Sequence, residues 1–145
     1  KRGIKQIFLI TARIRKNGNM QIKSKTGIVL PLLRGDIYMV NLDPVTGKEI
    51  GKARPAVIIQ NDIGNKFSPV TIIAPISSVK EITKPLPIMI YLNELEGGLK
   101  EESYVDCGQI RTIDSKERLI TKIGTLSHHK MLEINKALKI SLSID

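Results

Sequence analysis

The sequence predicts a small, mainly β domain that ends in a single helix. After Arg34, short β-branched runs alternate with Gly, Pro, Asn and Asp turns, and after Ser127 apolar residues recur at helical spacing. No segment long enough for a crossover helix separates the β-branched runs, so we expect a small barrel or a strongly bent sheet. The 145 residues suit one domain with its own hydrophobic core.

Five segments after Arg34 are predicted as strands. Pro44 should end the first strand, because proline has no N–H to donate to a neighbouring strand. Gly108 predicts a bulge or bend within the fifth strand. A mobile loop is expected at residues 46–52 and a turn cluster at residues 61–65. The predicted strands are residues 36–42, 55–60, 70–76, 86–92 and 103–113.

The C-terminal segment has the pattern of an amphipathic helix. Ser127 suits the N-cap position, and apolar side chains follow on one face: Met131, Ile134, Leu138 and Leu142. This stripe could pack against the barrel or against another subunit. Residues 115–120 predict a shorter helix before it.

The positive charge of the chain is concentrated at its N-terminus. The net charge is +9, and residues 1–33 contain eight basic and no acidic side chains, whereas residues 34–145 are close to neutral. A basic arm can attract polyanions, but a solvated tail, or sequence from upstream of the natural start, is the simpler interpretation. We therefore expect residues 1–33 to be an N-terminal extension outside a core domain of residues 34–145.

Composition excludes several classes of protein. Cys107 is the single cysteine, so an internal disulfide is impossible, and no zinc-ligand spacing is present. The longest apolar runs are far shorter than the roughly 20 residues of a membrane helix. We expect a cytoplasmic protein with no membrane segment, metal or cofactor.

Three clusters of polar residues are candidates for a phosphate or nucleic-acid site. Arg54 opens an apolar strand next to a glycine-containing loop with Lys48, Glu49 and Lys52, although a plain surface arginine fits equally well. The third strand ends in two hydroxyls, Ser77 and Ser78, and the fifth contains Gln109 and Arg111. Arginine and hydroxyl groups bind phosphate, and glutamine can read base edges.

Six segments, in order and at family spacing, resemble the MazF/PemK toxins of bacterial toxin–antitoxin pairs. They are residues 34–38, 42–44, 47–49, 54–62, 65–69 and 109–114. The resemblance implies a homodimeric, SH3-like β-barrel that cuts single-stranded RNA at short sequences without a metal. It also implies a cognate antitoxin that covers the RNA groove.

The resemblance also assigns roles to individual positions. The family's catalytic arginine falls on Arg54, its catalytic threonine on Ser77, its loop acid on Glu49 and its base-reading glutamine on Gln109. Glu49 is the nearby acid that could take the proton of the RNA 2′-hydroxyl. We expect further RNA contacts from Lys48, Lys52, Asn61, Phe67, Ser68, Ser78 and Arg111.

This chain departs from the family pattern at positions that concern base recognition. Ser77 keeps the hydroxyl of the usual threonine, but Ile50 replaces a polar residue and Cys107-Gly108 replaces a bulky-acidic pair. The cleaved sequence is therefore not predicted. Two alternatives are a CcdB-like toxin that poisons gyrase and a non-catalytic RNA-binding barrel. The combination of Arg54 and Ser77 favours RNA cleavage over the gyrase-poisoning alternative.

Overall fold

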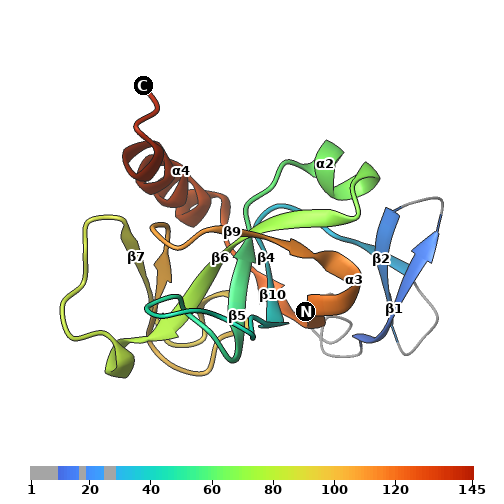
Figure 1. Ribbon diagram of the computed structural model, residues 1–145, viewed down its shortest axis with the longest axis horizontal. Coiled ribbons are helices and arrows are strands. Elements are labelled where there is room, and N and C mark those ends of the chain that lie inside the picture. The colour runs from blue at the N-terminus through green and yellow to red at the C-terminus, as the bar shows by residue number, and fades with distance from the viewer. Residues whose placement is uncertain (1–9, 17–18, 25–28) are drawn as a thin grey trace.

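The main body of the protein is a bent antiparallel sheet with one long helix packed on it (Figure 1). The computed structural model describes residues 10–16, 19–24 and 29–145. The seven-stranded sheet has the order β10-β4-β5-β6-β8-β7, and β9 also pairs with β6. This architecture confirms the predicted mainly β fold with a C-terminal helix. The strands are β4 (Asp36–Asn41), β5 (Ala53–Ile58), β6 (Val70–Ser78), β7 (Met89–Leu92), β8 (Ser103–Asp106), β9 (Arg111–Asp114) and β10 (Leu119–Thr125).

The nine-residue strand β6 connects the two halves of the sheet. Its first half pairs with β9, its middle with β5, and its last residues, Ile76–Ser78, with β8. Alternating side chains along β4 and β5 then enter two cores, with Ile37 and Val57 in one and Tyr38 and Ile58 in the other. The second half of β5 is buried on both faces, as its apolar run predicted.

The prediction of one continuous strand over residues 103–113 is wrong. It consists of β8 and β9, which both lie along β6 and are separated by residues 107–110. The bend predicted at Gly108 is confirmed. A side chain there would force Ile88 to move, because a Cβ would lie 2.3 Å from the Cδ1 of Ile88.

The turn predicted at residues 61–65 is also wrong, because the chain forms helix α2 (Asp62–Phe67). The Asn61 side chain accepts a hydrogen bond from the Gly64 N–H at 2.8 Å and caps the helix. Asparagine and aspartate start helices as readily as turns, which explains the error.

The region after β9 contains a shorter helix than predicted. Helix α3 (Ser115–Arg118) ends before Leu119, where β10 begins and pairs with β4. Strand β10 was not predicted, and it forms one edge of the main sheet.

The C-terminal helix α4 (His128–Leu142) confirms the prediction. The Ser127 side chain accepts from the Lys130 N–H at 3.1 Å, as the N-cap assignment required. Met131, Ile134 and Ala137 are buried in the first core, whereas Leu142 at the C-terminal end is 51% exposed. Most of the apolar stripe is therefore buried within the chain itself.

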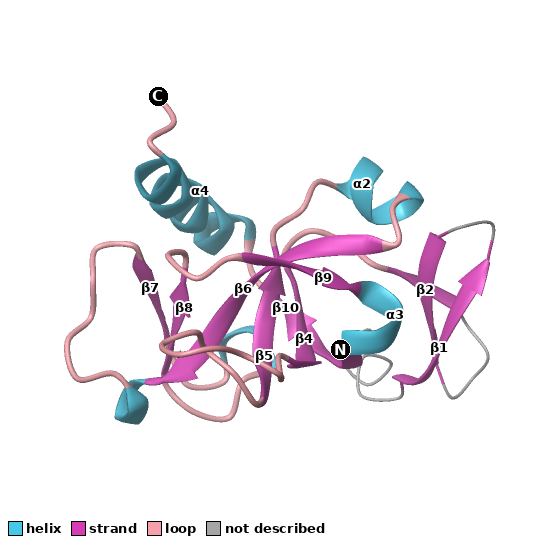
Figure 2. Cartoon of the chain, viewed as in Figure 1, coloured by secondary structure: helices cyan, strands magenta, loops and turns pink. Residues whose placement is uncertain are grey.

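A smaller sheet precedes the main one (Figure 2). It consists of β1 (Ile10–Lys16), β2 (Asn19–Ser24) and β3 (Val29–Pro31). Leu32, which follows β3, is buried in the second core with Tyr38 and Val40. The remaining parts of the predicted extension, residues 1–9, 17–18 and 25–28, lie outside the described residues. Among the helices of the described residues, none has the length and apolarity needed to cross a membrane.

Candidate active site

Arg54 is held by acceptors from three different segments. It is the second residue of β5, and its side chain is only 16% exposed. Its Nε donates to the Gly51 carbonyl at 2.8 Å, and its Nη1 donates to Ser77 Oγ at 2.8 Å and to Glu81 Oε2 at 3.0 Å. The guanidinium plane is therefore fixed, and its Nη2 makes no hydrogen bond to the described residues.

The sheet register explains why Arg54 and Ser77 meet. In the antiparallel pair of β5 and β6, Ala56 lies opposite Pro75, so two residues further out Arg54 faces Ser77. Side chains two residues apart on a strand share a face of the sheet. Ser77 is almost fully buried, and its oxygen accepts from Arg54, which leaves its hydroxyl hydrogen to donate to a ligand.

Sequence reasoning missed the third member of this cluster, Glu81. It lies in a short 3-10 turn, η1 (Val79–Glu81), which directly follows β6. Its side chain is 55% exposed and forms an ion pair with Arg54. The sequence offers no signal for it beyond an acid four residues after Ser77, because the turn that aims the carboxylate at Arg54 cannot be recognised from the residues alone.

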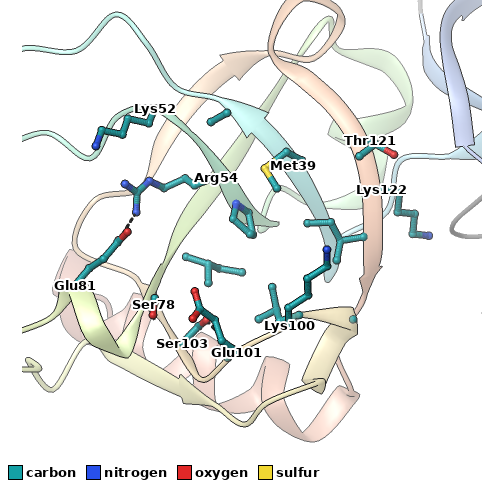
Figure 3. A pocket seen from close by; sticks show the side chains of 16 residues that line it. Met39, Lys52, Arg54, Ser78, Glu81, Lys100, Glu101, Ser103, Thr121 and Lys122 are labelled. Carbon is teal, nitrogen blue, oxygen red and sulfur yellow. Dashed lines mark hydrogen bonds and ion pairs between the residues drawn. The ribbon is translucent and has the colours of Figure 1, made fainter.

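A cavity of about 580 Å³ opens beside this cluster (Figure 3). Its wall includes Arg54 and Glu81, and its apolar surface comes from Met39, Pro55, Ile76 and Leu99. Its charged and hydroxyl side chains come from several strands and loops, and they include Lys52, Ser78, Lys100, Glu101, Ser103, Thr121 and Lys122. Two of the predicted RNA-contacting residues, Lys52 and Ser78, thus line the same cavity as Arg54.

A second cavity of about 520 Å³ contains the other predicted loop residues. Lys48, Glu49, Gln109 and Arg111 line it. The Gln109 amide is bound to the loop backbone, because its Oε1 accepts from the Ile50 N–H at 2.7 Å and its Nε2 donates to the Lys48 carbonyl at 3.2 Å. Arg111 donates to the Leu42 carbonyl at 2.9 Å. In this structure Gln109 fixes the loop that follows β4.

The structure does not bring the remaining predicted RNA contacts to Arg54. Asn61, Phe67 and Ser68 belong to α2 and its caps, which follow the far end of β5 (Figure 1). Asn61 and Ser68 use their side chains locally, with Ser68 Oγ accepting from the Val70 N–H at 3.2 Å. Phe67 is 67% exposed, and Lys66 Nζ lies 5.4 Å from its ring centroid.

Cys107 is not a nucleophile of this site. It is fully buried in the first core, and burial raises the pKa of its thiol to about 12. The thiol therefore stays protonated at neutral pH. Within the part of the chain that the structure describes, no three His, Cys, Asp or Glu side chains gather as a metal site requires.

Comparison with known proteins identifies the family. Residues 33–142 match the profile of the PemK-like, MazF-like toxins of type II toxin–antitoxin systems. The chain belongs to this family. It is 44% identical over 112 residues to endoribonuclease MazF of Staphylococcus epidermidis, covering 77% of this chain and 92% of that protein. It is 43% identical over 111 residues to endoribonuclease EndoA of Bacillus subtilis (strain 168), covering 77% and 94%.

Solved structures share the fold of the MazF/PemK family with this chain. MazF from Deinococcus radiodurans superposes with a TM-score of 0.65 at 20% identity, covering 78% of this chain and 97% of that one. A mycobacterial endoribonuclease, solved in complex with its cognate antitoxin, gives a TM-score of 0.64 at 22% identity, covering 79% and 97%. The MazF-like fold predicted by the resemblance is confirmed.

Proposed function

We propose that this MazF-type endoribonuclease toxin cuts single-stranded RNA by attack of the RNA's own 2′-hydroxyl on the adjacent phosphorus. A bond forms between the 2′ oxygen and phosphorus, and the bond from phosphorus to the 5′ oxygen breaks. The products are a 2′,3′-cyclic phosphate and a 5′-hydroxyl. The nucleophile belongs to the substrate, so this route needs no metal and cannot act on DNA. The observation that best supports this mechanism is the hydrogen bond between Arg54 Nη1 and Ser77 Oγ at 2.8 Å.

Arg54 is suited to stabilise the negative charge that develops on the phosphoryl oxygens. Its guanidinium is planar and permanently charged, and its Nη2, which no described residue binds, can donate two hydrogen bonds. Ser77 can donate its hydroxyl hydrogen to the same phosphate. Together they would hold the phosphate for in-line attack and stabilise the departing 5′ oxygen, which then takes a proton from water.

Glu49 is our proposed acceptor for the 2′-hydroxyl proton. It lies in the same loop as Gly51, whose carbonyl accepts from Arg54 Nε at 2.8 Å. This contact ties the loop to the arginine that binds the phosphate. Glu49 lines the second cavity, so the loop would have to carry its carboxylate to the phosphate before it could take the proton.

Replacement of Arg54 by alanine tests the proposal. We expect Arg54→Ala to lower the cleavage rate by about 10²–10³-fold, the usual cost of removing one transition-state donor. Lys116→Ala, which removes an equal charge from the exposed surface of α3, should cleave at the wild-type rate. Cleavage at the wild-type rate by Arg54→Ala would reject the assignment.

The nucleophile is tested separately by the substrate. A single 2′-deoxy nucleotide at the cut site should abolish cleavage, and end sequencing should find cyclic phosphates and 5′-hydroxyls. Cutting that persists at the deoxy position would instead indicate water as the nucleophile.

We also infer the partners of this chain from its family. It should form a homodimer and bind a cognate antitoxin protein, and its substrate should be cytoplasmic RNA. Helix α4 leaves Leu132, Ile140 and Leu142 exposed, which gives an apolar surface for such contacts. Analytical ultracentrifugation tests the dimer, and growth arrest that an antitoxin gene relieves tests the partnership.

A further inference from the structure

We propose that Glu81 is a positioning residue for RNA cleavage, because its carboxylate fixes the orientation of the Arg54 guanidinium. This inference rests on the proposed function, since it gives Glu81 a role only through the arginine that binds the phosphate. The ion pair between Arg54 Nη1 and Glu81 Oε2, at 3.0 Å, is the observation behind it (Figure 3).

The three contacts of Arg54 leave its guanidinium one orientation. Nε is bound by the Gly51 carbonyl, and the two hydrogens of Nη1 are shared between Ser77 and Glu81. Loss of the Glu81 contact would leave one hydrogen of Nη1 without an acceptor. The guanidinium would then be held by Gly51 and Ser77 alone, so its tilt could vary and Nη2 would point less uniformly to one place.

The short turn that contains Glu81 is itself held in place. The Ser78 side chain accepts from the Lys80 N–H at 3.3 Å, and the Ile82 N–H donates to the Val79 carbonyl at 3.2 Å. The Val79 N–H donates to the Glu102 carbonyl at 3.1 Å and fixes the start of the turn to the neighbouring segment. Because only Ser78 separates Ser77 from this turn, the hydroxyl and the carboxylate are held as one unit against Arg54.

The exposure of Glu81 indicates that its effect is on geometry and not on folding. Its side chain is 55% exposed, and ion pairs of such exposed groups add little to stability. Arg54 is already held by two other acceptors and does not need Glu81 to be buried in the folded chain. The consequence of removing the carboxylate should therefore appear in the rate of cleavage.

Three variants measure this role in single-turnover and steady-state cleavage of a short single-stranded RNA. We expect Glu81→Ala to lower kcat by about 10- to 100-fold while KM changes by less than about threefold. Glu81→Gln should keep at least about a third of wild-type kcat, because its amide oxygen accepts the same hydrogen bond. Its pH profile should have the wild-type shape. Glu94→Ala removes an exposed carboxylate that lines neither cavity and does not touch Arg54, and it should cleave as the wild type does.

Three results would overturn the inference. Equal loss in Glu81→Gln and Glu81→Ala, with loss of the acidic limb of the pH profile, would make Glu81 a proton acceptor. Tighter RNA binding in both variants would show that the carboxylate competes with phosphate. An unchanged kcat in Glu81→Ala would show that Arg54 needs no third acceptor.

Controls separate this inference from the proposed function. Thermal melting of each variant checks folding, and Glu81→Asp, which retracts the carboxylate by one methylene, should also lower kcat if Glu81→Ala does not fold. An active Arg54→Ala would reject the proposed function itself. An inactive Arg54→Ala beside a fully active Glu81→Ala would reject only the role of Glu81.

Discussion

Replacement of Gln109 by alanine should release the loop that follows β4. The Gln109 amide makes two hydrogen bonds to that loop, from the Ile50 N–H at 2.7 Å and to the Lys48 carbonyl at 3.2 Å. Each such bond contributes about 0.5–1.5 kcal/mol net, so their loss should destabilise the closed loop by about 1–3 kcal/mol. This corresponds to an increase of about 5- to 150-fold in the open population.

Amide hydrogen exchange at Ile50 measures this change, because its N–H donates to Gln109 Oε1. We expect exchange at Ile50 to accelerate by at least about fivefold in Gln109→Ala. Gln60→Ala is the matched control, because the Gln60 amide instead contacts Asn65 and the Val70 carbonyl. Equal exchange at Ile50 in the wild type and Gln109→Ala would show that the loop is held by other contacts.

Three further changes probe the site and the core. Ser77→Ala should lower the cleavage rate by about 10²–10³-fold in single-turnover assays, whereas Ser77→Thr should keep most of it, because threonine supplies the same hydroxyl. Gly124→Ala should destabilise the fold by about 1–3 kcal/mol or more in urea titrations, since a Cβ there would lie 2.1 Å from the Gly97 carbonyl oxygen. Cys107 should resist thiol reagents at pH 8 until the protein unfolds. Folding raises the pKa of this thiol from 9.0 to about 12. The free energy of unfolding should therefore fall as the pH increases through this range, and it should fall less in Cys107→Ala.

Local sequence signals were sufficient for some elements and insufficient for others. Strand β5 and helix α4 were predicted because a continuous apolar run and a capped helical stripe each indicate one structure. Helix α2 was missed because its six residues include Gly64 and begin with residues that also favour turns. Strand β10 is stabilised by its pairing with β4, a long-range contact that no local pattern reveals.

The candidate site was predictable only as far as residue chemistry allowed. Arg54 and Ser77 were identified from a phosphate-binding residue type at the start of one strand and a hydroxyl at the end of another, together with the family resemblance. Their contact depends on the register of β5 against β6, which is a tertiary property. The role of Gln109 in holding the loop depends on the turn at residues 107–110. The prediction assigned these residues to one continuous strand and therefore missed the turn.

The arrangement of β6 explains why the cluster around Arg54 is compact. One strand supplies Ser77 near its end, and the 3-10 turn that terminates the strand supplies Glu81 four residues later. Because β5 pairs with the middle of β6, its first residues lie beside that terminus, and Arg54 meets both side chains at once. A shift of two residues in this register would keep every apolar side chain of β5 on its present face of the sheet, yet would separate the guanidinium from the hydroxyl. The site therefore depends on register more strictly than the core does, so substitutions at the β5–β6 interface should impair cleavage before they unfold the protein.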